Sequence, residues 1–600
     1  MRLREARSEG RMTSFINADS YCAPLVFLVG VATFAGCMGL GLAFLRLLRV
    51  NLPAPFLQVV AALTGIQLNS LAVQAIAMAH AATPAVLVAF CGASLAGGVL
   101  GLVCFRPASE GGFLRGIPRI ALVIALVACG ANLLAAVVPS SKIDELHYHM
   151  LLPARIVADH GLEFYRQPIE AAILPHMAFQ VFATPLHALG FPDAPNIVSW
   201  LLGTMLVWSG WTLLRQRGVT AAAPYCLVAA IPAGAYPVVF HVTGGSHAFG
   251  DLSLAIAAVA LATSDALLAA SSPVAFGMAV SLLSWSAASS KLSLFPIAFA
   301  VLMLGGCLAW RSADSNARSR VIAALAAPWL IFGAPLMLWT FLQSGSPFGP
   351  FLAGDFGASL YDPNAFDNFA NKGTAAVDPA HWRTMFFDNL AGYSPLIWLA
   401  TLGALVSKAV PPQVRLWGGV LLLGQLAIIA WLIPFHARFL GGLQYGLVLC
   451  FALYGAQSVA GLGRAAWFVL ALGLAPWIAG QIYYARQFAP VAFGLEDRAA
   501  FYRRYVAFYD DYVKLDRLLP RNAVLLARDF RAPAVYAPRP MVFESRDVPP
   551  GREIFLFSGT RPQIGDASVY FNAQARIEVY RRPWAEARTG ELDVTHLVLK

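Results

Sequence analysis

The sequence predicts a polytopic α-helical membrane protein that ends in a small α/β or α+β domain. Of its 600 residues, 58% are hydrophobic and only 12% are charged, with a mean hydropathy of +0.64. So few charges could not cover the apolar surface of a water-soluble chain, and the repeated runs of about 20 apolar residues match the thickness of a bilayer. Beyond about residue 495, Arg, Asp, Glu and Tyr become common, which marks a separate polar domain.

Hydropathy predicts about 14 spans along the chain. They lie near 24–48, 55–80, 83–105, 120–139, 196–214, 222–240, 251–270, 274–289, 291–310, 321–341, 394–409, 416–433, 440–459 and 465–482. Several are short, which indicates tilted or broken helices. We divide the chain into additional N-terminal helices (1–119), a transmembrane core (120–482) and a C-terminal polar domain (483–600).

Two connections in the core are unusually long, and long loops in a compact protein are usually functional or disordered. They are 140–195 and 342–393, the second rich in aromatic residues and therefore expected to form a folded or membrane-resting cover. In the polar domain we expect a helical entry at 497–519. Short β-like runs follow at 523–527, 534–536, 553–557, 568–572 and 576–580.

Basic residues in short loops set the expected orientation, because Lys and Arg favour the cytoplasmic side. Such loops alternate consistently from residue 106 onward, near 106–119, 215–217, 311–320, 408–415 and 464. This places 140–195, 241–250, 342–393, 434–439 and the polar domain on the outer side of the membrane. The basic segment 1–12 conflicts with the rule, because three spans before residue 106 would put it outside as well.

Charge and cysteine usage exclude several functions. The net charge of +10 lies largely in these short loops, so it does not indicate a nucleic-acid partner. All eight cysteines fall in or beside apolar runs, which argues against a disulfide framework and against a cysteine metal site. The first apolar run is too long for a signal peptide, so we expect none that is cleaved.

Asp144 and Glu145 are adjacent acids just beyond an apolar span, at the start of an amphipathic segment that ends near Gly161. Asp144 has the position of a helix N-cap, with Gly161 as the C-cap. It also suits a general base, because a carboxylate within hydrogen-bond reach can take the proton of a poorly nucleophilic hydroxyl. Glu145 would share that function or bind a metal, and a divalent metal stays open.

Four further residues near the acids are candidates for lining a site: His147, Tyr148, His149 and His176. Histidines at an interface most often pack or form hydrogen bonds, so this is the simpler interpretation. A metal site near the two acids is the alternative. The spacing is not that of the HExxH motif, so a metalloprotease is not predicted.

Charged residues recur at the same predicted outer edge. Arg438, with His436 two residues before it, stands at the mouth of a span, where it either extends toward the interface or clamps a phosphate with its planar fork of donors. Lys291 lies between two short spans, where a charge is costly and often functional. Asp251 either caps the helix that it begins or lines the same site. Acids to activate an acceptor and cations to stabilise a departing phosphate suit a lipid-phosphate donor.

A family resemblance follows from these motifs. The segment from Asp144 to Pro153 resembles the acidic motif of the GT-C superfamily of integral-membrane glycosyltransferases. Residues 160–165 with 174–176 resemble bacterial dolichyl-phosphate-mannose mannosyltransferase-like and ArnT-like proteins. Arg438-Phe-Leu is similar to their late Arg–aromatic motif. Residues 345–351 are similar to their Gly-Asn-Pro-x-x-Pro-Phe pattern, from which Ser346 departs.

The resemblance covers roughly 120–600 and implies inverting transfer of a sugar from an undecaprenyl-phosphate-type donor to an extracytoplasmic glycan, lipid or protein. It implies that Asp144 and Glu145 form the catalytic motif, and that Arg438, aided by Lys291, binds the donor phosphate. A transporter or flippase of lipid-linked saccharides and a non-catalytic membrane scaffold are the alternatives. Membrane lipids are expected partners in each case.

Overall fold

The structure is a computed structural model. It describes residues 21–105, 116–164, 176–349, 356–357, 392–432, 437–455, 464–527, 533–543, 548, 551–557, 567–572 and 577–582. His436 and most of the loop expected at 342–393 lie outside these residues, as do 1–20 and 583–600.

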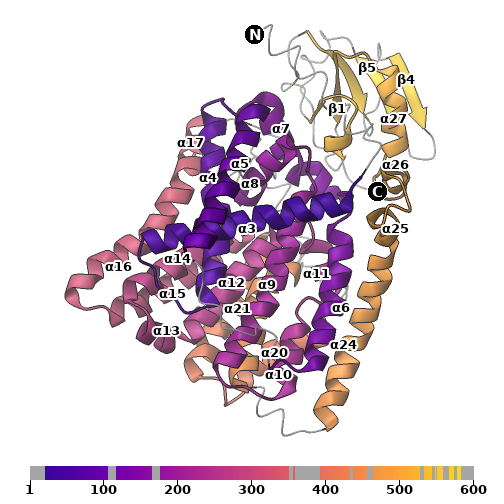
Figure 1. Cartoon of the computed structure of the whole chain (residues 1–600). Coiled ribbons are helices and arrows are strands. Elements are labelled where there is room, and N and C mark those ends of the chain that lie inside the picture. Colours follow the sequence, from indigo (N-terminus) through magenta and orange to yellow (C-terminus); the bar gives the residue numbers. More distant parts are fainter. Residues whose placement is uncertain are drawn as a thin grey trace.

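Helices make up most of the described residues before 519 (Figure 1). The longer ones are α3 (Ala23–Leu47), α4 (Phe56–Met78), α5 (Pro84–Cys104), α6 (Arg119–Ala136), α9 (Ala194–Gln216), α12 (His247–Ala262), α14 (Pro273–Ala288), α15 (Phe295–Ser312), α16 (Ser315–Pro328), α20 (Pro395–Val406), α21 (Pro412–Leu432) and α24 (Arg464–Ala485). Shorter ones are α7 (Leu151–Asp159), α8 (Ala178–Ala188), α10 (Ala222–Ala229), α11 (Ala235–Phe240), α13 (Ser264–Ala270), α17 (Ala334–Ser344), α22 (Gly441–Cys450) and α25 (Ala489–Ala492).

The chain is a many-span helical membrane protein. Within the described ranges, nine helices are long and apolar enough to cross a bilayer, and α12 with α13, bent by 83° at Thr263, gives a tenth if counted as one span. Each of the predicted spans coincides with a helix or a pair of helices. The predicted span at 222–240 is the pair α10 and α11, separated near Gly234, which has a φ of +135° that side-chain-bearing residues rarely adopt.

Successive connections between the helices lie alternately at the two ends of the bundle, as the sequence predicts. At one end, which we name the sheet end, lie Ser140, Gly244 and Arg438, all within hydrogen-bonded or ion-paired reach of the segment 140–145. Tyr21 donates to the carbonyl of Val137 at this same end, so α3 begins there. Three long helices, α3, α4 and α5, therefore precede α6, and the first of them begins at the sheet end.

Helices α3, α4 and α5 pack at backbone distance through glycines. A Cβ built on Gly41 would lie 1.8 Å from the carbonyl oxygen of Ala61, and one on Gly39 would lie 1.9 Å from that of Gly98. Small residues permit such close approach of helices inside membranes. Gly30 of α3 meets Ile197 of α9 in the same way, so the first three helices are joined closely to the core.

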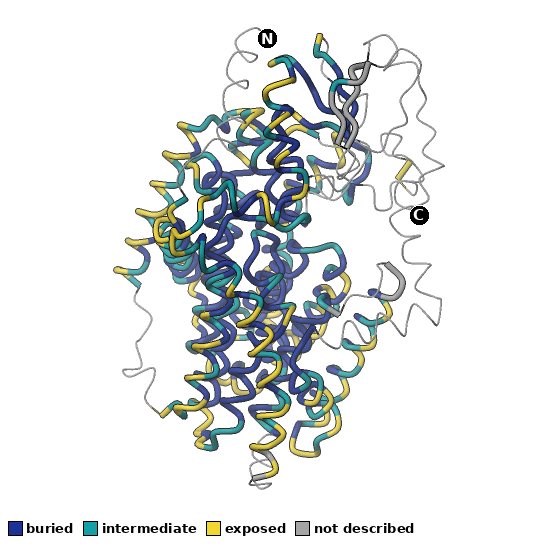
Figure 2. Tube along the Cα trace, turned by 90° about the vertical axis from the view of Figure 1, so that its right-hand side faces the viewer, coloured by how far each residue is buried: buried dark blue, intermediate teal, exposed yellow. Residues whose placement is uncertain are grey.

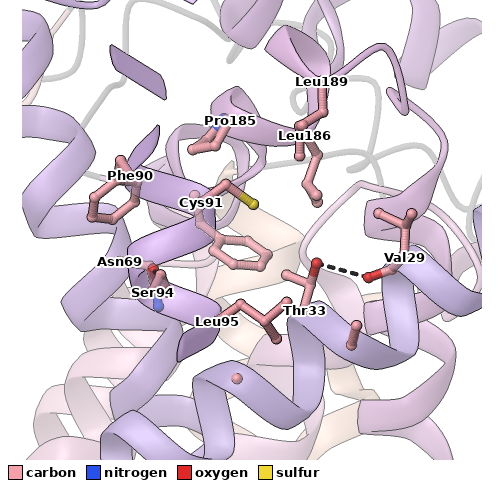
Figure 3. Close-up of a pocket in the computed structure, with 13 residues that line it drawn as sticks. Val29, Thr33, Asn69, Phe90, Cys91, Ser94, Leu95, Pro185, Leu186 and Leu189 are labelled. Carbon is pink, nitrogen blue, oxygen red and sulfur yellow. Dashed lines mark hydrogen bonds between the residues drawn. The ribbon is translucent and has the colours of Figure 1, made fainter. Parts of the chain in front are cut away.

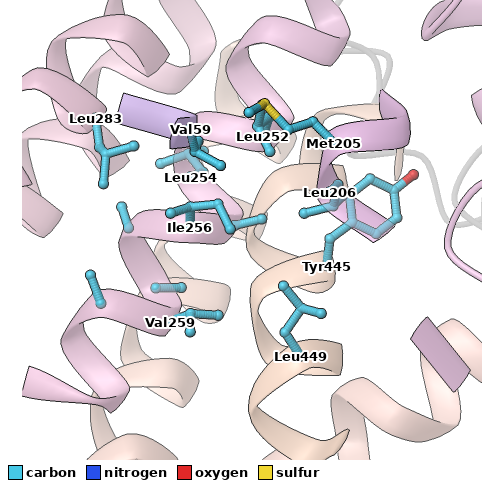
Figure 4. Close-up of a cluster of buried hydrophobic side chains, with 14 of the residues drawn as sticks. Val59, Met205, Leu206, Leu252, Leu254, Ile256, Val259, Leu283, Tyr445 and Leu449 are labelled. Atoms are coloured by element: carbon cyan, nitrogen blue, oxygen red, sulfur yellow. The ribbon is translucent and has the colours of Figure 1, made fainter. Parts of the chain in front are cut away.

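The centre of the bundle is apolar and fully buried, whereas large apolar side chains on its outside are exposed (Figure 2). Figure 4 shows part of the core, in which side chains of α4, α9, α12, α14 and α22 meet. Leu100 of α5 and Leu423 of α21 expose 63% and 68% of their surface. Outward-facing leucines are expected where lipid tails replace water as the solvent.

A small mixed sheet forms the C-terminal part, at the top of Figure 1. Two helices lead into the sheet, α26 (Arg498–Tyr505) and α27 (Tyr509–Leu518), where a helical entry was predicted at 497–519. The strands are β1 (Ala523–Ala527), β2 (Met541–Val542), β3 (Glu553–Phe557), β4 (Ala567–Asn572) and β5 (Ile577–Arg582). Their order is β2-β1-β3-β5-β4, with parallel pairing among the first three and antiparallel pairing of β5 to β3 and β4.

Two details of this sheet differ from the sequence prediction. Residues Ala534–Tyr536 were expected to be a strand but form a single turn of 3₁₀-helix, whereas the two-residue strand β2 was not predicted. The 3₁₀ turn lets Tyr536 point back to the membrane bundle, where its hydroxyl donates to the carbonyl of Ser140 at 3.1 Å. A tertiary contact therefore determines the local structure here rather than β propensity.

Candidate active site at the sheet end

The segment that carries the two acids is a turn of π-helix, Glu145–His149, followed by α7. Asp144 precedes it with helical dihedral angles and makes no capping hydrogen bond. The predicted N-cap role is therefore wrong. Asp314 and Asp497 show what a cap looks like in this chain, because their carboxylates accept from the backbone N–H three residues later at 2.7 and 2.6 Å.

The C-terminal end of this helix also differs from the prediction. His160, rather than Gly161, adopts the left-handed conformation that ends α7, with a φ of 55°. Gly161 is needed for another reason: a Cβ there would lie 2.3 Å from the imidazole of His80. The loop between α4 and α5 therefore lies against this turn, and Ala82 donates to the carbonyl of His160 at 2.9 Å.

The carboxylate of Asp144 is the exposed acid of the pair. Its side chain is 36% exposed, and its Oδ2 lies 3.8 Å from Nη1 of Arg438, which is 19% exposed. The two residues are separated by almost 300 positions, so the fold brings them together as the sequence analysis expected of the outer edge. At this distance the pair is an open ion pair rather than a tight bidentate one.

Aromatic rings surround the cations of the site. The Cζ atom of Arg438 lies 4.6 Å from the ring centre of Phe240 and 5.0 Å from that of Phe439. Lys291 reaches the same Phe439 ring at 5.5 Å. His247 stacks on Phe439 as well, at 5.9 Å between ring centres. Ring faces attract cations without neutralising them, so the positive charge of both side chains is kept at the site.

Glu145, next to Asp144, is buried instead, with 3% exposure. Its Oε1 accepts from the backbone N–H of Gly244 at 3.0 Å and from the hydroxyl of Ser140 at 3.4 Å. Burial raises the pKa of Glu145 to about 7, although Lys142 and the Gly244 hydrogen bond both act to lower it. The Lys142 ammonium in turn donates to the carbonyl of Val239, and burial lowers its pKa to about 8.

The histidines predicted to line the site differ in position. His149 lies with Lys291 and Arg438, since both cations help burial to lower its pKa well below the ordinary range, and its Nδ1 is 2.7 Å from the amide nitrogen of Gln180. His147 contacts the ring of Phe543 at 5.3 Å, and Tyr148 packs beside both neighbouring imidazoles.

The Nδ1 atom of His176 lies 2.5 Å from the carbonyl oxygen of Ala288, at the end of α14. Burial lowers its pKa to about 4, so the imidazole is neutral at physiological pH. This supports the simpler interpretation of His176 as a packing residue. The position of His436 lies outside the described residues.

Asp251 is not the N-cap of its helix, because α12 begins at His247 and Asp251 lies within its second turn. Its Oδ2 is 2.7 Å from Nε2 of His241, and both side chains are buried. A Cβ on Gly441, three residues after Arg438, would lie 2.8 Å from the same carboxylate. The His241–Asp251 pair therefore lies directly behind the segment that carries Arg438.

Sequence reasoning missed several residues of this site, namely Ser140, Lys142, His241, Phe240 and Gly244. A signal existed only for Gly244, in the conspicuous run Gly244-Gly-Ser-His247, where Ser246 has a φ of 50°. Among the residues the structure describes, no group of three or more His, Cys, Asp or Glu side chains could hold a metal ion.

A separate cavity of about 170 Å³ lies away from this site, between α3, α4, α5 and α8 (Figure 3). Its walls are almost entirely apolar, and its polar side chains bond within the protein: Ser94 to Asn69 at 2.6 Å and Thr33 to Val29 at 2.8 Å. None of the charged residues discussed above lines it.

Comparisons with known proteins add no relative to this picture. No protein-family model matches the chain, and neither a curated protein nor a solved structure does. The fold and its hydropathy alone assign the class, and by these the chain is a many-span helical membrane protein with a small C-terminal sheet.

Proposed function

We propose that this protein is a membrane glycosyltransferase of the GT-C type that uses a polyprenyl-phosphate-linked sugar, with Asp144 as the general base. The sheet end would face the outside of a bacterial inner membrane, and the acceptor would be an extracytoplasmic glycan, lipid or protein. The observation that carries the proposal is the meeting of the exposed Asp144 carboxylate with Arg438 and its aromatic support, built from segments far apart in the sequence.

The chemistry needs a base and a phosphate-binding group within one site. Asp144 takes the proton of the acceptor hydroxyl as its oxygen attacks the anomeric carbon. The bond from that carbon to the phosphate oxygen breaks on the opposite face, so the configuration inverts and both electrons leave with the phosphate. Arg438 and Lys291 stabilise the charge that develops there, because fixed cations in a site poor in water act strongly on nearby charge.

The charge balance of the site suits an anionic donor. Asp144, Arg438 and Lys291 carry formal charges of −1, +1 and +1, which leave an excess of +1 among them. A guanidinium offers donors along its edge, so Arg438 can contact a phosphate while it stays near Asp144. Asp144 makes no capping hydrogen bond, so its carboxylate is not engaged by the helix that follows it.

The deciding experiment is sugar transfer by the purified protein in nanodiscs, with a panel of polyprenyl-phosphate sugars and with Asp144→Asn alongside. We expect Asp144→Asn to lower the transfer rate by roughly a thousandfold or more, about 4 kcal/mol in activation free energy. Its thermal stability should stay near that of the unmodified protein, because Asp144 is not a cap. The matched control is Asp314→Asn, where Asn caps as well as Asp and transfer should be unchanged.

Equal transfer or donor hydrolysis by the unmodified protein and Asp144→Asn would reject Asp144 as the base. Binding of a donor that is never cleaved would reject the enzyme altogether. The second candidate, a transporter of lipid-linked saccharides, would then stand, and it has support from the bent pair α12–α13 and from the buried Asp251–His241 pair. Broken helices and buried ionisable residues are typical of transporters.

A further inference from the structure

Lys142, which is half-buried, and Glu145, which is buried, hold the segment 239–244 at its two ends. Lys142 donates to the carbonyl of Val239, and Glu145 accepts from the N–H of Gly244. Lys142 and Glu145 are three residues apart in the segment after α6, whereas 239–244 comprises the end of α11 and the start of its connection to α12. The segment between the two anchors contains Phe240 and His241.

Phe240 links this segment to Arg438. Its ring lies 4.6 Å from the guanidinium, which lies 3.8 Å from Asp144. His241, the next residue, holds Asp251 behind Gly441, close to the same stretch of chain. A closed path of contacts therefore runs from Lys142 and Glu145 through 239–244 to Arg438 and back to Asp144, which lies in the sequence between Lys142 and Glu145.

We propose that Lys142 and Glu145 form a positioning clamp on segment 239–244, which fixes Arg438 opposite Asp144, and that Glu145 takes no part in the bond-forming step. The catalytic role of this clamp rests on the proposed function, whereas its structural role does not. Glu145 is a positioning residue here because it is buried, its oxygen is engaged by Gly244 and Ser140, and the neighbouring Asp144 is the exposed acid.

The charged groups that face the clamp are few and come from different elements. Lys142 faces Glu145 from the same turn, Asp193 faces it from the start of α9, and Tyr484 lies near it from α24. Arg498 balances Asp193 from the C-terminal part, 4.0 Å away. A buried carboxylate and a half-buried ammonium that also bind backbone groups are costly to separate, which suits a rigid anchor.

The test uses hydrogen exchange of the full-length protein in detergent, read on peptides covering 239–247, together with donor KM and kcat. Glu145→Ala removes the acceptor of the Gly244 N–H, and we expect exchange there to rise on the order of five- to tenfold. Glu145→Gln retains an acceptor, so protection should persist and transfer should fall by only a few-fold. Lys142→Met keeps the length of the side chain but loses the donor to Val239, and should raise the donor KM.

The matched control is Glu163→Gln, an acid at the same end that is half exposed and pairs with His80 at 3.7 Å. It should alter neither exchange nor transfer. Should Glu145→Ala fail to fold, Lys142→Met and Ser140→Ala test the same clamp, each removing one of its contacts, and faster exchange of 239–247 is expected in both.

Several results would overturn the clamp. One is unchanged exchange in Glu145→Ala, or in both Lys142→Met and Ser140→Ala. Another is a Glu145→Gln protein with native protection but transfer as low as that of Asp144→Asn, which would make the Glu145 charge part of the chemistry. If the unmodified protein transfers no sugar, the proposed function fails, while the exchange data still decide the clamp.

Discussion

Two aspartate–arginine pairs lie at the short segment 140–145, and they differ in how far they are exposed. Asp144 and Arg438 lie 3.8 Å apart with 36% and 19% of their side chains exposed. Asp193 and Arg498 lie 4.0 Å apart with 3% and 11% exposed. The distances are alike, so the difference lies in the surroundings.

The buried pair belongs to a network in which most polar atoms are engaged. Asp193 accepts from the backbone N–H of Ser140 at 2.8 Å, and Arg498 donates to the hydroxyl of Tyr502 at 2.6 Å. Tyr502 shares a hydrogen bond with Tyr536, which donates to the carbonyl of Ser140. This network joins the C-terminal part to the membrane bundle.

The exposed pair, Asp144 and Arg438, takes part in few such hydrogen bonds. Asp144 makes no capping bond, and Nε of Arg438 has no hydrogen-bond partner among the described residues. A closed network uses up its donors and acceptors in holding two parts of the protein together, whereas an open pair retains them for a ligand. The same two residue types therefore suit structure in one place and chemistry in the other.

The largest expected effect is on stability. Asp193→Ala leaves the Arg498 guanidinium and the Ser140 N–H without their buried partner, which should cost about 3 kcal/mol in unfolding free energy. Thermal unfolding and limited proteolysis of the C-terminal part would measure it. The control Asp314→Ala, at an exposed cap, should cost about 1 kcal/mol. Equal losses of unfolding free energy in Asp193→Ala and Asp314→Ala would show that the buried pair contributes no more than an exposed cap, and the distinction between the two aspartate–arginine pairs would fail.

Glu145, which lies between the two pairs, should make stability depend on pH. Its pKa is raised to about 7 in the folded protein, so between the ordinary carboxyl range and neutrality the folded state binds more protons than the unfolded state. Stability should therefore fall as the pH rises from about 4.5 to 7. Glu145→Gln lacks this loss and should gain on the order of 2 kcal/mol relative to the unmodified protein between pH 5 and pH 7.5.

Melting curves of both proteins across this pH range provide the measurement. The window stops near pH 7.5 because Lys142, with a pKa lowered to about 8, has the opposite influence at higher pH. Parallel curves for the two proteins would show that Glu145 is not held in a desolvated environment.

Arg438→Lys sharpens the comparison at the exposed pair. Lysine keeps the charge but loses the planar fork and the stacking on Phe240, so we expect the donor KM to rise about tenfold with stability nearly unchanged. Arg311→Lys, at an exposed position in α15, serves as control and should change neither quantity. A donor KM equal to that of the unmodified protein would remove Arg438 from phosphate binding.

Tyr536→Phe should give the smallest effect. It removes the hydroxyl that joins Tyr502 to the Ser140 carbonyl, at a cost of about 1 kcal/mol. Chemical denaturation resolves a change of this size if the unfolding is reversible. A loss of transfer without a loss of stability would instead place the buried network in catalysis.

The sequence predicts the membrane helices well because hydropathy is a local property. The predicted spans at 24–48, 55–80 and 83–105 match α3, α4 and α5 to within two residues at each end. The bent and broken helices could not be located in this way. The bend of 83° between α12 and α13 occurs at Thr263, in the polar triplet Thr263-Ser-Asp265, and hydropathy averaged over a whole span does not register so short an interruption.

The candidate site could be predicted only in part. Asp144, Arg438, Lys291 and His149 do meet at one end, as the alternation of basic loops implied. The π-helical turn Glu145–His149 decides which of the two adjacent acids faces outward. Such a turn holds one more residue than an α-helical turn, and the amino-acid composition does not reveal it. Phe240 and Ser140 were missed because their importance arises from contacts with residues hundreds of positions away.

The ring faces around Arg438 bear on the direction from which a ligand can arrive. The ring centres of Phe240 and Phe439 lie 4.6 and 5.0 Å from Cζ of Arg438, so the two rings shield part of the guanidinium and leave an anion the remaining N–H donors. Spherical ions gain little from such a narrow approach, whereas a group with two oxygens in one plane gains two parallel contacts. If the proposed phosphate-linked donor binds here, the accessible N–H donors of Arg438 would fix the orientation of its phosphate.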